Sequence, residues 1–201
     1  MSYSTEHIRN IALAGHAGAG KTTLFEALLH AGGVIPTQGS VERGTTQSDT
    51  DAQEKARGHS IDSGIAGIDR DGCRINLIDT AGYADFRGGT LAAFAAVETV
   101  AVVVNAAAGI EHGTRRMMEH ARERGLARVL VINRIDAEGA DLPALVEALR
   151  EAFGSECLPV NLPADGGRRV LDCFFHAEGA TDFSSLTEAH RRILDQVVEV
   201  S

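Results

Sequence analysis

The sequence has no tryptophan, and aromatic residues make up only 4% of its 201 residues. No aromatic platform on which nucleic-acid bases could stack is therefore visible. Acidic residues outnumber basic ones by 28 to 19, which gives a formal net charge of -9. This balance argues against binding to DNA through general neutralisation of phosphates, and we expect no sequence-specific DNA partner.

Long apolar runs and closely spaced cysteines are also missing. The longest apolar run, residues 100–104 with the alanines beyond Asn105, is too short to span a bilayer, so we expect no membrane partner. The three cysteines lie far apart without C-x-x-C spacing, which indicates reduced thiols and a cytoplasmic protein. Hydrophobic residues at 44% and charged residues at 23% are typical of a globular chain with a sizeable core.

One glycine-rich stretch carries the clearest chemistry. Residues 15–22 read Gly-His-Ala-Gly-Ala-Gly-Lys-Thr and match the P-loop pattern G-x-x-x-x-G-K-[ST]. An apolar run at 8–14 predicts a strand before it, and residues 21–31 predict a helix after it. The alternative is a glycine-rich strand-to-helix turn with a surface lysine, and the partner motifs below disfavour it. The predicted nucleotide-binding residues here are Gly15, His16, Ala17, Gly18, Ala19, Gly20, Lys21, Thr22 and Thr23.

Two short motifs and one serine accompany this loop. In Asp79-x-x-Gly82 the carboxylate can hold Mg²⁺ and the glycine N–H can meet a γ-phosphate. In Asn133-x-x-Asp136 the carboxylate can accept both hydrogens that guanine offers and adenine lacks. Ser60 ends a polar segment, residues 36–60, that we predict to be a mobile nucleotide-sensing loop anchored only by γ-phosphate and Mg²⁺. The predicted metal ligands are Thr22, Ser60 and Asp79.

The order of the predicted elements gives the fold class. Strand-like and helical stretches alternate through residue 153, which predicts an α/β fold with a doubly wound, mostly parallel sheet covered by helices on both faces. An Asp-Gly pair at 71–72 predicts a hairpin between strands at 63–69 and 73–78. Further helices are expected at 90–98, 113–124 and 141–153, and strands at 100–105 and 129–132. Ligands in such sheets bind at the carboxyl ends of the strands.

The rhythm changes after residue 157. We predict a sixth strand at 157–163 and another strand at 168–175 in a small appended unit. Ser185-x-x-Glu188 is a capping box that opens a helix reaching about residue 200.

Together these motifs resemble the translational GTPases, and within them the elongation factor G group. The resemblance extends over residues 8–200 and includes the stretches at 53–58, 79–86, 105–111 and 158–163. It implies a P-loop NTPase G domain over residues 1–160 and the beginning of an inserted subdomain over 161–201. It further implies GTP and GDP as ligands with Mg²⁺, GTPase activity, and the ribosome as a partner of the full-length protein. The family's Ser-Ala guanine loop is absent, so we interpret the chain as an N-terminal fragment.

The sequence departs from the family at positions that matter for hydrolysis. Tyr83 stands where the family has the histidine that positions the attacking water, and His59 stands where it has an isoleucine. Arg134 replaces a lysine that packs on the guanine, and with Asn133 and Asp136 it completes the predicted base site. The predicted catalytic residues are Tyr83, His59, Lys21 and Gly82. Two hypotheses stay open: a GTPase that drives a ribosomal step, or a regulatory nucleotide-binding module with little hydrolysis.

Overall fold

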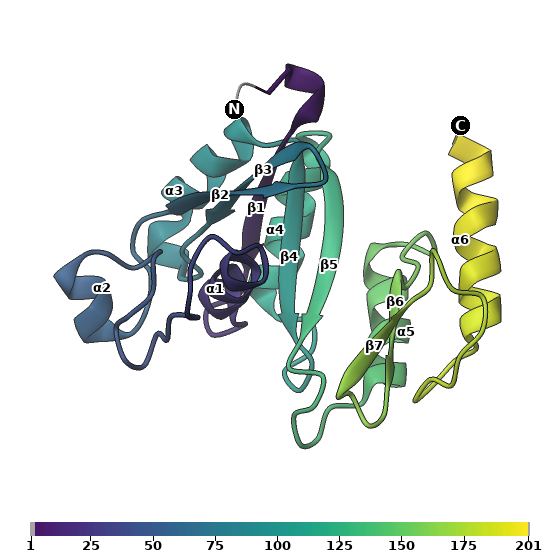
Figure 1. Cartoon of the computed structure of the whole chain (residues 1–201). Helices are drawn as coiled ribbons and strands as arrows, with labels where there is room; N and C mark the ends of the chain where they lie inside the picture. The colour runs from purple at the N-terminus through teal and green to yellow at the C-terminus, as the bar shows by residue number, and fades with distance from the viewer. Residues whose placement is uncertain (1–2, 201) are drawn as a thin grey trace. The chain divides into compact units, whose positions relative to one another are not determined.

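The computed structural model describes residues 3–200 (Figure 1). The chain divides into two compact units, and each is described by itself. The first unit comprises residues up to Asn105 together with Glu111–Asn133. The second unit comprises Ala106–Ile110 and the chain from Arg134 onward.

A five-stranded sheet forms the centre of the first unit. Its spatial order is β2 (Gly64–Arg70), β3 (Cys73–Asp79), β1 (Ile8–Gly15), β4 (Thr99–Asn105) and β5 (Ala127–Asn133). All neighbouring strands are parallel except β2 and β3, which form the antiparallel hairpin predicted from Asp71-Gly72. Residues 100–104 of β4 are all buried, as a strand covered on both faces requires.

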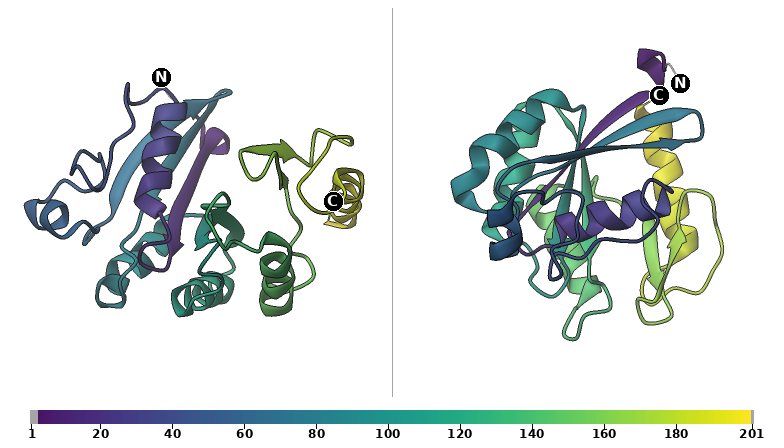
Figure 2. Two further views of the ribbon diagram at one scale, coloured as in Figure 1. Left: turned by 90° about the horizontal axis from the view of Figure 1, so that it is seen from below. Right: turned by 60° about the vertical axis from the view of Figure 1, so that its left-hand side comes forward.

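Helices cover both faces of this sheet, as predicted. Helix α1 (Lys21–Ala31) packs against β1, β2 and β3, and α4 (His112–Glu123) packs against β1, β4 and β5. Figure 2 shows α1 on one face of the sheet and the helices α3 and α4 on the other. The core under α1 consists of Leu13, Phe25, Leu29, Ile68, Leu77 and Ala101. This packing fixes the start of α1, and therefore the P-loop, against the ends of β1 and β3.

The segment between α1 and β2 is more ordered than the sequence suggested. It contains α2 (Ala52–Arg57), which the sequence analysis did not predict. A capping box starts this helix: Gln53 N donates to Asp51 Oδ1 at 2.6 Å, and Asp51 N donates to Glu54 Oε2 at 3.1 Å. Gly58, with φ of 65°, ends it. The prediction that γ-phosphate and Mg²⁺ would be the only anchors of residues 36–60 was wrong, because several buried protein contacts also hold them.

The helix after the Asp79 motif begins earlier than predicted. Helix α3 spans Arg87–Ala93 and continues as a 3₁₀ turn, Phe94–Ala96, after another 3₁₀ turn at Ala84–Phe86. The pair Gly88-Gly89 argued against a helix there by propensity. A tertiary contact favours it, since Thr90 Oγ1 donates to Ala81 O at 3.0 Å and ties the helix to the preceding turn.

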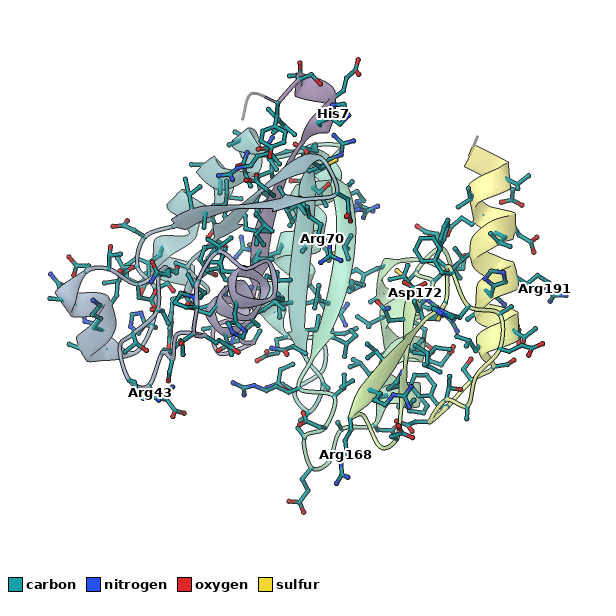
Figure 3. All side chains as sticks on the ribbon, in the orientation of Figure 1. His7, Arg43, Arg70, Arg168, Asp172 and Arg191 are labelled. Carbon is teal, nitrogen blue, oxygen red and sulfur yellow. The ribbon has the colours of Figure 1, made fainter. Side chains whose placement is uncertain are left out.

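The second unit contains α5 (Leu142–Phe153), α6 (Leu186–Val200) and a two-stranded antiparallel sheet of β6 (Asn161–Ala164) and β7 (Arg169–Asp172). The sixth strand predicted at 157–163 is therefore shifted, and it pairs with β7 in a sheet of its own. Asp172, labelled in Figure 3, ends β7 by accepting hydrogen bonds from Phe174 N and Phe175 N. A core of Leu162, Cys173, Leu186, Ala189 and Ile193 joins this sheet to α6.

Within residues 3–200, no helix is both long enough and apolar enough to cross a membrane.

Candidate functional site

The P-loop adopts the tight conformation that its glycines permit. Gly15, Gly18 and Gly20 have φ values of 137°, 78° and 92°, which other residues rarely adopt. A Cβ on Gly15 would overlap the carbonyl oxygen of Val103 on β4, so the loop lies directly against the sheet. Gly20 is the N-cap of α1, and the helix begins at Lys21. The loop therefore presents backbone N–H groups at a helix N-terminus, which is an anion-binding arrangement.

Lys21 lies inside this loop. Its ammonium donates to His16 O at 2.9 Å and to Gly15 O at 3.4 Å, and the residue is only 6% exposed. Burial lowers the pKa of Lys21, and the negative charges of Asp79 and Glu111 oppose that shift. A phosphate group would give this buried cation an anionic partner.

Asn133 reaches the P-loop from the end of β5. Its side-chain amide donates to Ala19 O at 3.0 Å, and a Cβ on Gly20 would overlap the same amide. Asn133 therefore holds the P-loop through this hydrogen bond, and it is also the first residue of the predicted base motif.

Gly82 approaches the P-loop from the other side. A Cβ at this position would overlap Lys21 Nζ and approach the backbone of Ala17 within 3.0 Å. The Asp79-x-x-Gly82 turn thus lies against the loop, and only glycine fits there.

The three predicted metal ligands, Thr22, Ser60 and Asp79, come together. Thr22 Oγ1 donates to Asp79 Oδ2 at 2.7 Å and lies 3.1 Å from Ser60 Oγ. Ser60 Oγ in turn donates to Asp49 Oδ1 at 2.7 Å. Each hydroxyl has one proton, and both protons already go to carboxylates. The hydroxyl oxygens of Thr22 and Ser60 therefore lie close together beside the Asp79 carboxylate, an arrangement of oxygen atoms that suits a cation.

Asp79 adds a second sign of a cation site. It is fully buried, and its Oδ1 atom is one of two buried side-chain polar atoms in the described residues without a hydrogen-bond partner. Burial raises the pKa of Asp79 to about 6, although hydrogen bonds from Thr22 and Ser48 and the charge of Lys21 oppose the shift. Hydroxyl and carboxylate oxygens are ligands that suit Mg²⁺. The residues present fit that ion, with Thr22, Ser60 and Asp79 as the groups that would hold it.

Four residues of this site were missed by the sequence analysis: Glu26, Ser48, Asp49 and Glu54. All four are buried. Glu26 accepts hydrogen bonds from Gly39 N at 3.2 Å and from Gln47 N at 2.6 Å. Glu54 accepts from the backbone after Ser60, at Ile61 N and Asp62 N. Only Glu54 had a visible signal, the capping-box spacing from Asp51.

His59 and Tyr83 pack against each other. Their ring centroids are 4.6 Å apart, and the His59 ring also lies 6.1 Å from that of Phe86. The two predicted catalytic residues, which lie in separate loops, therefore meet at one point of the site, with Tyr83 47% exposed.

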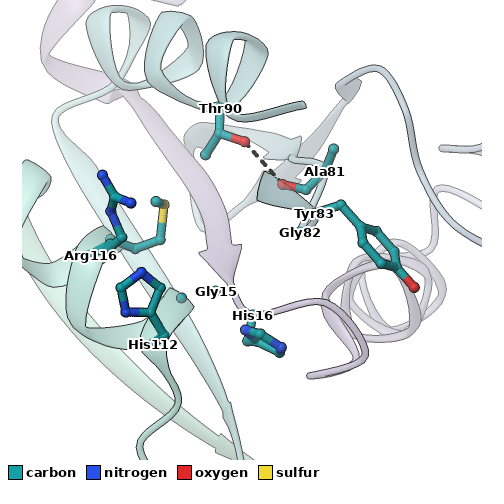
Figure 4. Close-up of a pocket in the computed structure, with 10 residues that line it drawn as sticks. Gly15, His16, Ala81, Gly82, Tyr83, Thr90, His112 and Arg116 are labelled. Carbon is teal, nitrogen blue, oxygen red and sulfur yellow. Dashed lines mark hydrogen bonds between the residues drawn. The ribbon is translucent and has the colours of Figure 1, made fainter. Parts of the chain in front are cut away.

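A pocket opens beside the P-loop. Gly15, His16 and Gly82 line it together with Thr90 of α3 and with His112 and Arg116 of α4 (Figure 4). His112 and Arg116 are one helical turn apart and bring basic groups to this wall. The Tyr83 ring points away from the hollow, as Figure 4 shows.

The remaining base-site residues, Arg134 and Asp136, belong to the second unit. Arg134 has φ of 57° and starts a turn in which Ala137 N donates to Arg134 O at 3.1 Å. Both side chains are exposed. Thr23 is exposed in the first turn of α1. Among the described residues there is no cluster of three or more His, Cys, Asp or Glu side chains that could hold a metal.

Comparisons with known proteins show the family to which the chain belongs. Residues 6–200 match the family model of the elongation factor Tu GTP binding domain. An elongation factor G-like protein of Mycobacterium tuberculosis is 33% identical over 205 residues, covering 96% of this chain and 29% of that protein. Peptide chain release factor 3 of Gloeobacter violaceus is 38% identical over 175 residues, which cover 84% of this chain and 33% of that protein.

A solved structure has a similar fold. A crystal structure of a protein from Thermus thermophilus superposes with a TM-score of 0.85 at 34% identity. The match covers 97% of this chain and 32% of that one. The chain thus spans about a third or less of the length of these relatives.

Proposed function

The chain belongs to the family of elongation factor Tu GTP-binding domains, and we propose that it binds GTP and GDP with Mg²⁺ and hydrolyses GTP in a ribosome-linked cycle. The observation that carries the proposal is the meeting of Thr22, Ser60 and Asp79, with Asp79 Oδ1 buried and without a hydrogen-bond partner. The similarity to translation factors supports the ribosome as partner and, with it, a cytoplasmic location.

Each part of the site has a role in this proposal. The backbone of residues 15–22 and the ammonium of Lys21 bind the phosphates, and Gly82 N–H meets the γ-phosphate. Bound Mg²⁺ would neutralise the charge that develops on the phosphate oxygens. Asp136, with Asn133 and Arg134, selects guanine because its carboxylate pairs with two donors that adenine lacks.

Hydrolysis needs an oriented water, and the proposed residues for this are Tyr83 and His59. Phosphoryl transfer depends mainly on positioning and charge stabilisation. Tyr83 carries a hydroxyl where the family carries an imidazole. Its hydroxyl can orient the water while the neighbouring imidazole of His59 supplies the hydrogen bond. The contact between the two rings supports a joint role.

A second function is favoured by the same tyrosine. With Tyr83 in place of a histidine and 47% exposed, the chain would exchange GTP and GDP as a regulatory module with little hydrolysis. Both functions share the nucleotide site and differ only in the rate of the chemical step.

Single-turnover hydrolysis of GTP by the chain, measured with and without ribosomes, separates the two functions. A GTPase cleaves bound GTP within the assay and faster with ribosomes, and Lys21→Ala abolishes the signal. A regulatory module retains intact GTP under both conditions. If the chain binds no GTP, with or without ribosomes, both functions are contradicted.

A further inference from the structure

Ser48 contacts the buried carboxylate of the predicted metal site. Its Oγ donates to Asp79 Oδ2 at 2.8 Å, and the residue is only 8% exposed. The same oxygen accepts the hydrogen bond from Thr22. Two hydroxyl donors therefore converge on Oδ2, whereas Oδ1 receives none.

Contacts of the neighbouring residues determine the position of Ser48. Gly64, the first residue of β2, lacks the Cβ that would overlap Ser48 Oγ, so the serine approaches the sheet directly. The residue before it, Gln47, is held by its backbone N–H on the buried carboxylate of Glu26. The residue after it, Asp49, accepts the hydrogen bond from Ser60. The residues on both sides of Ser48 are thus held by hydrogen bonds, and Gly64 leaves the space that its hydroxyl occupies.

We propose that Ser48 is a positioning residue for the magnesium ligand Asp79. This inference rests on the proposed function, since it concerns the same metal site. Two donors on Oδ2 oppose rotation of the carboxylate, so Oδ1 stays the oxygen without a hydrogen-bond partner and is available to the cation. Without Ser48, one of the two donors is lost and the carboxylate must be reordered when Mg²⁺ binds.

The test compares affinity for a fluorescent GDP analogue across a Mg²⁺ titration and in EDTA, using the whole chain. In Ser48→Ala, the Mg²⁺ concentration that gives half of the metal-dependent gain rises about tenfold or more, as expected for loss of a hydrogen bond to a charged group. Affinity in EDTA stays within about twofold of wild type, because a lost hydrogen bond at the metal ligand does not touch the nucleotide. A serine that only supported the fold would lower affinity equally in both conditions.

Two further variants complete the design. Gly64→Ala keeps the Ser48 hydroxyl but displaces it by the added methyl group, and it shifts the Mg²⁺ titration in the same direction. Thr50→Ala removes an exposed hydroxyl two residues away and leaves the titration unchanged. The inference is overturned if Ser48→Ala behaves like Thr50→Ala, or if it weakens binding equally in EDTA. Failure of wild type to bind the GDP analogue with Mg²⁺ would instead contradict the proposed function.

Discussion

Burial of Asp79 carries an electrostatic cost at the site. Its folded-state pKa of about 6 lies above the ordinary value of 3.8. Between these values the folded state binds more protons than the unfolded state, so stability falls as pH rises from about 4 to about 6. The loss is at most about 3 kcal/mol at roughly 1.4 kcal/mol per pKa unit.

We predict that Asp79→Asn removes this pH dependence. Urea unfolding without nucleotide or metal gives the free energy of unfolding of both proteins at pH 4 and at pH 7. The value for the variant minus the value for wild type should be about 2 kcal/mol larger at pH 7 than at pH 4. A relative stability that is the same at both pH values would show that Asp79 is not destabilised by burial. Asp165→Asn, at an exposed carboxylate in the second unit, is the matched control.

The contact between His59 and Tyr83 makes a prediction about the chemical step. His59→Ala should slow single-turnover GTP hydrolysis about tenfold or more, in the range typical of general acid–base or positioning groups. Tyr83→His in that background should restore part of the rate, because an imidazole then stands at the neighbouring position. If His59→Ala hydrolyses at the wild-type rate while Ser60→Ala is slower, His59 has no part in the reaction.

Glu26 anchors the backbone of the segment between α1 and β2. Its carboxylate accepts two backbone hydrogen bonds, from Gly39 and Gln47. Glu26→Gln replaces one acceptor oxygen with a donor that faces an N–H group. We predict at least about tenfold faster hydrogen exchange at Gly39 and Gln47, equivalent to about 1.4 kcal/mol of local stability.

The same experiment has an internal reference and a control. Amides of β1 should exchange at the wild-type rate in Glu26→Gln. Glu42→Gln, at an exposed position in the same segment, should change nothing. Equal exchange at Gly39 and Gln47 in all three proteins would mean that the carboxylate does not anchor the segment.

At the level of elements, the sequence predicted most of the first unit because its signals are local. The P-loop glycines, the Asp71-Gly72 turn and the apolar run of β4 each determine structure over a few residues. The boundaries of α1 were predicted correctly. The start of α3 was not, because Thr90 bonds to Ala81 O across a turn and overrides the glycine pair. The pairing of β6 with β7 depends on a contact between distant residues that no local pattern specifies.

The candidate site divides in the same way. The meeting of Thr22, Ser60 and Asp79 could be predicted because Thr22 and Asp79 belong to motifs and Ser60 ends the polar segment at residues 36–60. Their role as metal ligands stays a prediction. Glu26, Ser48 and Asp49 could not, since an isolated acidic or hydroxyl residue carries no signal until the fold buries it. The contact between His59 and Tyr83 was missed because it joins two separate loops.

At the scale of the whole molecule, the division into two units makes a prediction about stability. Leu162 is fully buried in the core of the second unit. Leu162→Ala should destabilise that unit by about 2–5 kcal/mol, as cavity-forming substitutions do. Hydrogen exchange should therefore accelerate in residues 134–200 and remain unchanged in β1, β3 and β4.

The control for this variant is Val170→Ala, at a residue of β7 that is 56% exposed. It should leave exchange unchanged throughout. If Leu162→Ala accelerates exchange equally in the main sheet, the two units unfold as one. Our sequence-based division into residues 1–160 and 161–201 rests on the resemblance to elongation factors and stays a prediction.

The central claim is that this chain binds guanine nucleotides with Mg²⁺. Calorimetric titration of the chain with GDP and with ADP, each in excess Mg²⁺, tests it most directly. The account predicts that GDP binds at least about a hundredfold more tightly than ADP, because adenine would desolvate the Asp136 carboxylate without donating hydrogen bonds to it. Equal affinity for the two nucleotides, or heat of binding for neither, would contradict the account.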